Sequence, residues 1–268
     1  MRLSVYHQSI YRYDQPARSV VQSHRLTPSR FQGQRVIDWS VEVSDGIKGG
    51  GFRDGAGDWV QGWSVPGPVS EITVTVRGTV ETSDLAGVLQ GHRESAPPLA
   101  WLRDTLPTRA DTALSDLAQS VQGADGLSLA HALAGAVADA IAYRPGVTHA
   151  HTTAAEALAL GEGVCQDHAH ALIALARLRD MPARYVSGYL QADADGAAHE
   201  AAHAWAEIFI EGLGWVGFDP ANRCCPDARY IRLGSGLDAR EAAPIRGIAR
   251  GNGAEALDVQ VAVDAQQQ

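Results

Sequence analysis

Alternating apolar and polar side chains dominate the first third of the chain. Residues 3–13, 36–43 and 70–80 follow the period of two that half-buried β-strands require. Pairs such as Asp45-Gly46 separate these segments and favour turns. Short regular strands joined by turns predict a small β-sandwich domain over residues 1–85.

From residue 95 the apolar positions recur at helical spacing. Residues that favour helix starts precede four segments: Pro97-Pro98, Asp111, Ser128 and Thr153, the last completing a capping box with Glu156. Apolar positions then predict a helix over residues 165–179. Strand-like patterns follow over residues 184–190, 203–220, 230–233 and 256–263. The order predicts an α+β fold, in which a helix bundle plus an antiparallel sheet forms a core over residues 86–268.

The helix over residues 165–179 follows two glycines, Gly161 and Gly163, and places Cys165 in its first turn. Unpaired backbone N–H groups and the helix dipole favour negative charge there, so a thiolate is stabilised and the sulfur becomes a better nucleophile. A lone cysteine is also commonly a small buried apolar residue. This stretch alone leaves both interpretations open.

A predicted hairpin supplies two possible partners for that thiol. If its turn centres on Glu211, Ile208 faces Gly214 and His203 faces Asp219 across the strand pair. An imidazole beside a carboxylate is the arrangement that holds a general base in its working tautomer. A one-residue slip of register would separate the two side chains, because neighbours along a strand point to opposite faces.

Composition and charge narrow the class of protein. Apolar residues make up 45% of the chain and charged residues 20%, as in ordinary soluble proteins. The net charge of −9 and the lack of a Lys/Arg run argue against nucleic-acid and membrane partners. Neither a spanning apolar run nor a signal peptide is visible. Three cysteines, Cys165, Cys224 and Cys225, favour a reducing compartment, and we expect a cytoplasmic protein.

Metal sites are weighed as alternatives. His199 and His203 could join the cysteines and His168 or His170 around zinc, but the four-residue spacing shares a face only on a helix. Calcium needs six to eight oxygen ligands, and the acidic residues before His203 are sparse: Asp193, Asp195 and Glu200. We therefore expect no metal and no cofactor.

Within residues 143–220 the chain resembles the transglutaminase-like superfamily of papain-type thiol enzymes. The matching stretches are Tyr143-Arg-Pro-Gly146, Glu156-Ala-Leu158, Gly163-Val-Cys-Gln-Asp167, Pro182-Ala-Arg-Tyr-Val-Ser-Gly-Tyr-Leu190, His203-Ala-Trp205 and Gly214-Trp-Val-Gly-Phe-Asp-Pro220. Their order, Cys…His…Asp, is that of the family. The chain is most similar to the bacterial two-domain group with an N-terminal β-domain, and the resemblance extends less specifically to residues 1–83 and 243–247.

The resemblance implies a catalytic triad with Cys165 as nucleophile, His203 as base and acid, and Asp219 as the residue that orients His203. It also implies acyl transfer on amide bonds, and the bacterial members favour hydrolysis of a peptide or isopeptide bond in a peptide or protein substrate. Transfer to an amine, which crosslinks glutamine side chains, is an alternative. The second alternative is that the protein is a non-catalytic binding module. The oligomeric state stays open.

Four further residues are candidates for substrate binding. Tyr189 and Trp205 could form cleft walls, although aromatic residues more often lie in a core. Glu207 shares the strand face of His203. His168 stands where the family usually has an aromatic residue, and it lies one helical turn from Cys165, so a second imidazole near the thiol is expected.

Overall fold

The computed structural model describes residues 1–191 and 202–266. Its N-terminal strands are β1 (Arg2–His24), β2 (Gln34–Val43), β3 (Ile47–Arg53) and β4 (Trp59–Thr82). The helical part holds η1 (Pro98–Leu102), α1 (Thr112–Ser120), α2 (Gly126–Ala140), β5 (Ala142–Tyr143), α3 (Ala154–Leu160), β6 (Glu162–Gly163) and α4 (Cys165–Leu178). The last strands are β7 (Ala183–Leu190), β8 (Ala202–Ile210), β9 (Gly214–Phe218), β10 (Tyr230–Gly236), β11 (Ile245–Arg250) and β12 (Glu255–Ala265).

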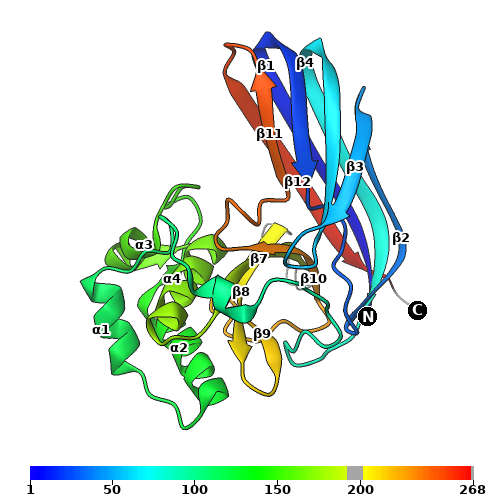
Figure 1. The fold of residues 1–268 in the computed structure, drawn as a ribbon. Coiled ribbons are helices and arrows are strands. Elements are labelled where there is room, and N and C mark those ends of the chain that lie inside the picture. The colour runs from blue at the N-terminus through cyan, green and yellow to red at the C-terminus, as the bar shows by residue number, and fades with distance from the viewer. Residues whose placement is uncertain (192–201, 267–268) are drawn as a thin grey trace.

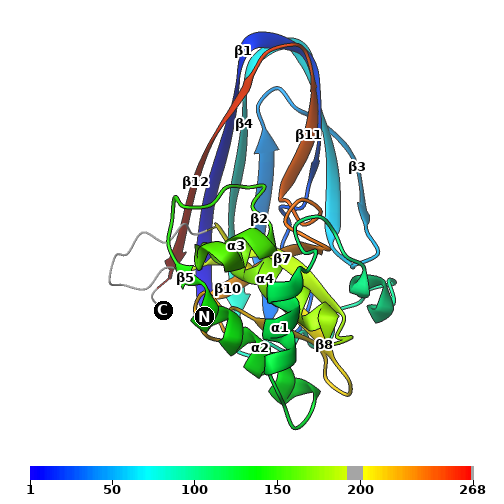
Figure 2. The same cartoon turned by 90° about the vertical axis from the view of Figure 1, so that its left-hand side faces the viewer.

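The N-terminal region is one antiparallel sheet that folds over on itself. Strands β1 and β4 pair along most of their length, with register shifts between Arg12, Ala17 and Ser19. Figure 2 shows both strands arching at the top of the molecule. The two arms enclose an apolar core that includes Leu3 and Val65, so the predicted β-rich region is present as two layers of a folded sheet.

The C-terminal strands complete this same sheet. Strand β12 pairs with the first half of β1, from Leu3 opposite Ala265 to Tyr13 opposite Glu255. Strand β11 pairs with the second half, where Val21 lies opposite Ile248. The sequence assigned this segment to the core over residues 86–268, whereas β11 and β12 pair with the open edge of β1. The division near residue 85 stays a prediction.

The core is the predicted α+β assembly. A four-stranded antiparallel sheet in the order β10-β7-β8-β9 packs against α4, and α1, α2 and α3 lie around that helix (Figure 1). Asp111 caps α1 and Thr153 caps α3 as predicted, whereas Asp125 rather than Ser128 caps α2. After Pro97 the chain forms only one short 3₁₀ turn, because Leu99 and Leu106 remain exposed and gain no apolar contact.

Buried charges join the core to the N-terminal sheet. Arg232 of β10 donates to Asp58 at 2.6 Å and to Glu207 of β8 at 2.8 Å, and all three side chains are almost fully buried. Glu207 also accepts from Arg184 of β7 at 2.6 Å. Across the described residues, no helix is both long and apolar enough to cross a membrane.

Candidate active site

Cys165 occupies the first position of α4, as the sequence predicts. Asp167 holds this turn together: one of its carboxylate oxygens accepts the backbone N–H of Val164 at 2.8 Å and the hydroxyl of Thr148 at 2.6 Å. A Cβ atom at Gly163 would lie 2.8 Å from that carboxylate, so a glycine is required there. The thiol is half-buried at the open end of the helix.

His203 lies between Asp219 and Cys165. Its Nε2 is 2.6 Å from Oδ2 of Asp219, which leaves Nδ1 as the ring nitrogen for the thiol. Burial alone would lower the pKa of His203, but hydrogen bonds and charge from Asp219 and Cys165 outweigh burial and raise the pKa to about 10. The imidazolium in turn keeps the pKa of Asp219 below its usual range, against the opposing effect of burial.

The hairpin brings His203 and Asp219 together in a different register from the predicted one. Ile208 faces Val216 rather than Gly214, because the turn centres on Gly212 and not on Glu211. Gly212 and Gly214 both have positive φ, which lengthens the turn. The slip is two residues, so every side chain keeps its face, and His203 reaches Asp219 diagonally instead of directly.

Two residues that the sequence analysis did not select also hold Asp219. Tyr230 donates its hydroxyl to Oδ2 of Asp219 at 2.8 Å, and Asn222 donates its amide to the same oxygen at 2.7 Å. The amide of Asn222 is also 3.2 Å from Nε2 of His203. Asn222 follows Asp219 by three residues in a turn, a spacing that could have indicated it, whereas Tyr230 comes from the next strand and has no local signal.

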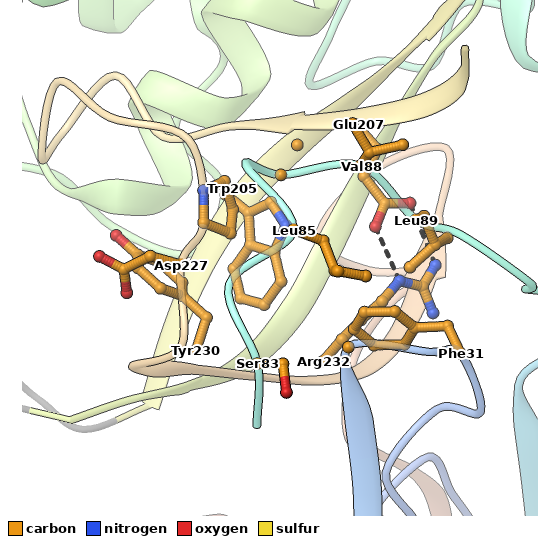
Figure 3. A pocket seen from close by; sticks show the side chains of 14 residues that line it. Phe31, Ser83, Leu85, Val88, Leu89, Trp205, Glu207, Asp227, Tyr230 and Arg232 are labelled. Carbon is orange, nitrogen blue, oxygen red and sulfur yellow. Dashed lines mark hydrogen bonds and ion pairs between the residues drawn. The ribbon is translucent and has the colours of Figure 1, made fainter. Parts of the chain in front are cut away.

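Trp205 and Glu207 lie on the same face of β8 as His203 but do not reach the thiol. The indole of Trp205 stacks beside the imidazole, with 6.4 Å between ring centroids, and its edge meets Tyr230. Figure 3 shows both rings and the Glu207–Arg232 pair around a pocket behind the histidine, closed on its other side by Phe31 and Leu85. Their predicted contact with substrate stays a prediction; Trp205 stacks beside His203, and Glu207 is bonded to Arg184 and Arg232.

Tyr189 and His168 lie in the interior. Tyr189 is 1% exposed and its hydroxyl is 2.7 Å from Nδ1 of His7 in the N-terminal sheet. His168 is equally buried, and its two ring nitrogens lie 2.9 Å from the carbonyl oxygens of Val164 and Ile141. Neither side chain is available to a substrate, so the structure does not support the predicted binding role of either residue.

The other two cysteines follow Asp219 in the chain, and Sγ of Cys224 lies 3.3 Å from the Tyr230 hydroxyl. Burial raises the pKa of Cys224, and burial together with the neighbouring Cys224 raises the pKa of Cys225 to about 11. Over residues 1–191 and 202–266, no three His, Cys, Asp or Glu side chains converge as metal ligands would. The zinc alternative through His199, and the acidic residues Asp193, Asp195 and Glu200, lie outside the described residues.

A depression flanks the thiol along α4. Val164 and Gln166, the two neighbours of Cys165, line it together with residues of the preceding loop: Tyr143, Pro145, Gly146, Thr148, His149 and Ala150. The Tyr143 ring is 38% exposed and lies 6.3 Å from the His168 ring between centroids. The depression therefore lies against the start of α4, next to the residue that carries the thiol.

Comparison with known proteins places this fold and site in a family. Residues 115–220 match the model of the transglutaminase-like superfamily, and residues 3–81 match the bacterial transglutaminase-like N-terminal region. An uncharacterized protein of Mycobacterium leprae is 31% identical over 280 residues, covering 98% of both chains. One from Mycobacterium tuberculosis is 29% identical over 290 residues, covering 98% of this chain and 92% of its own.

A solved structure shares the whole fold. It is that of a candidate cysteine protease from Cytophaga hutchinsonii, with a TM-score of 0.73, 22% identity, and coverage of 100% of this chain and 92% of that one. At this identity the likeness concerns the fold alone. The family models and the relative from Mycobacterium leprae together establish that the chain belongs to the transglutaminase-like superfamily.

Proposed function

We propose that the protein is a thiol-dependent enzyme that hydrolyses a peptide or isopeptide bond with Cys165, His203 and Asp219. The observation that carries this proposal is the position of His203, held 2.6 Å from Asp219 and close enough to Cys165 that the thiol helps to raise the pKa of the imidazole. Nucleophile, proton carrier and orienting carboxylate are the three roles that covalent acyl transfer requires.

The first half of the reaction forms a thioester. The Cys165 thiolate attacks the amide carbonyl carbon, a C–S bond forms, and the carbonyl oxygen becomes an oxyanion near the backbone N–H of Cys165 at the start of α4. The His203 imidazolium gives its proton to the leaving nitrogen as the C–N bond breaks. Asp219 keeps the imidazole in place through its bond to Nε2.

The second half regenerates the thiolate. Neutral His203 takes a proton from water while the water oxygen attacks the thioester carbon. The C–S bond then breaks, the acid product leaves, and His203 is again an imidazolium beside a thiolate. An amine in place of water would follow the same steps and give a new amide, so the acceptor distinguishes a hydrolase from an amine transferase.

The depression beside Cys165 supports an extended substrate. Its described lining includes polar and aromatic side chains without a formal charge, such as Gln166 and Tyr143, and nearby Arg144 and Glu162 pair with each other at 2.7 Å. A neutral channel suits a peptide backbone rather than a strongly charged small molecule.

The test is mass spectrometry of a diverse peptide library incubated with the protein, with and without an added primary amine. Hydrolysis products are expected with the wild type. None are expected with Cys165→Ala or His203→Ala, provided that each variant keeps the circular dichroism spectrum of the folded wild type. Amine adducts in excess of acids would instead favour the transferase. A library that stays intact while selected peptides bind would contradict catalysis and support the binding module.

A further inference from the structure

A depression at the edge of the N-terminal sheet is surrounded by arginines. Its lining residues are Arg30, Phe31, Gln32, Arg53, Gly57, Gly91, His92 and Arg93. The three arginines are exposed, and no carboxylate belongs to this described lining. The three guanidinium groups make this depression locally positive, although the net charge of the chain is −9.

Three chain segments are tied together to build this depression. Nε2 of His92 is 2.7 Å from the carbonyl oxygen of Ala56, and Nδ1 is 3.3 Å from that of Arg30. The backbone N–H of Gln32 donates to Gln90 at 2.8 Å. A Cβ atom at Gly57, whose φ is +81°, would lie 2.1 Å from the carbonyl oxygen of Arg93. The arginines therefore project from a closely packed base.

The acidic residues next to these arginines point elsewhere. Asp54 pairs with Arg25 at 3.0 Å. Asp58 pairs with buried Arg232, and Glu94 pairs with Arg184 and accepts the indole N–H of Trp215. These three carboxylates are thus each paired with a cation outside the depression.

The arginines keep hydrogen-bond donors free. Arg53 donates one N–H to the carbonyl oxygen of Gly57 at 2.7 Å and lies over the Trp59 ring at 5.8 Å, which fixes its direction. Among the described residues, Arg30, Arg53 and Arg93 make no ion pair. An anion bound among them would lower their mutual repulsion further than solvent and salt do.

We propose that this depression binds a polyphosphate group, as found in inorganic polyphosphate or on a nucleoside triphosphate. A guanidinium fork matches two oxygens of a phosphate, and three forks from three segments match a ligand with several phosphates better than a single ion. The volume, about 1390 Å³ including the open mouth, leaves room beyond the phosphates, and Phe31 and Gln32 offer an aromatic edge and an amide there.

Isothermal titration calorimetry of the full chain at low ionic strength tests the proposal, with tripolyphosphate, ATP, phosphate and citrate as separate ligands. Tripolyphosphate and ATP are expected to bind one site, and to bind at least about tenfold more tightly than phosphate or citrate. Added NaCl should weaken binding because the arginines are exposed. Tighter binding of ATP than of tripolyphosphate would indicate that the ligand is a nucleotide. Equal affinities would indicate that the site recognises the phosphate chain alone.

Variants assign the site. Arg30→Gln/Arg93→Gln removes two charges whose side chains hold no other part of the fold, and should weaken tripolyphosphate binding about tenfold or more. The control variant Arg18→Gln/Arg109→Gln removes the same charge from exposed arginines elsewhere. Its affinity for tripolyphosphate should stay within about twofold of the wild-type affinity. Cys165→Ala should bind as the wild type does. The proposal would be overturned if both double variants lost the same affinity for tripolyphosphate, or if neither tripolyphosphate nor ATP bound. Tighter binding of citrate, or of an added glutamate-rich peptide, than of tripolyphosphate would overturn it as well.

Discussion

The three thiols of the chain have different surroundings, and Cys165 is the one whose electrostatics are coupled to His203. Cys165 lies at a helix start beside His203, whose pKa is raised to about 10. Cys224 and Cys225 are partly buried without such a partner, and burial raises the pKa of both. The sequence was enough to place Cys165 at a helix start, because helix starts have local signals. It could not show that Tyr230 donates to Asp219, because that contact depends on how the strands pack.

Iodoacetamide should distinguish the three thiols. At pH 6–7 Cys165 is expected to alkylate at least about tenfold faster than Cys224 or Cys225, because attack requires the thiolate. Peptide mapping after timed quenching gives the three rates. In His203→Ala the advantage of Cys165 should shrink. Three equal rates in the wild type would contradict an activated nucleophile.

The His203–Asp219 pair should make stability depend on alkaline pH. A folded-state pKa of about 10 against 6.5 means that the imidazolium contributes stability fully below pH 6.5, and that this contribution is lost as the pH rises through about 10. The free energy of unfolding of the wild type should therefore exceed that of Asp219→Asn most at pH 6, and the gap should narrow by pH 10. Urea titrations across this range measure it, and a gap that widens would have the wrong sign.

At the scale of the element, the hairpin and α4 each carry part of the site. The predicted register of the hairpin was wrong by two residues, yet the predicted meeting of His203 and Asp219 was found, because an even slip preserves the faces of a strand. Sequence spacing predicts which face of the sheet a side chain points to better than it predicts the residue opposite on the next strand. The opposite residue depends on the length of the turn, which positive-φ glycines such as Gly212 change. For α4 the start was predictable, whereas the bond from Thr148 to Asp167 was not.

Asp167→Ala tests how far the start of α4 positions the thiol. Losing the acceptor for Val164 N–H should lower the free energy of unfolding by about 0.5–2 kcal/mol. It should also slow alkylation of Cys165, since the first turn loses its anchor. Asp125→Ala removes the cap of α2, away from the thiol, and is expected to destabilise the protein while leaving that rate unchanged. Similar alkylation rates in the two variants would show that Asp167 acts on stability alone.

At the scale of the molecule, the two sheets are joined through buried charge. Arg232 of the core sheet reaches Asp58 of the N-terminal sheet, and charge from Arg232 and Arg184 lowers the pKa of Asp58 although burial alone would raise it. No pattern within either segment predicts this contact, because the partners are far apart in the chain. The pairing of β11 and β12 with β1 escaped the sequence analysis for the same reason.

Asp58→Asn leaves the buried Arg232 without one of its two carboxylates. Breaking such a pair costs about 3–5 kcal/mol, so the midpoint of urea unfolding should fall clearly. Asp139→Asn removes a carboxylate from the exposed pair with Arg223 and should leave the midpoint unchanged. Equal midpoints for the two variants would indicate that the junction tolerates an unpaired arginine.

During synthesis on the ribosome, β1 is made long before β11 and β12, the two strands that pair with its edge. The backbone N–H of Ala254 donates to the side chain of Asp14, 240 residues earlier in the chain. At a translation rate of ~5–20 residues per second, β1 emerges roughly 12–48 s before this partner exists. Strand β1 therefore waits with one edge open, and the nascent sheet needs β11 and β12 before the hydrogen bonding of β1 is complete.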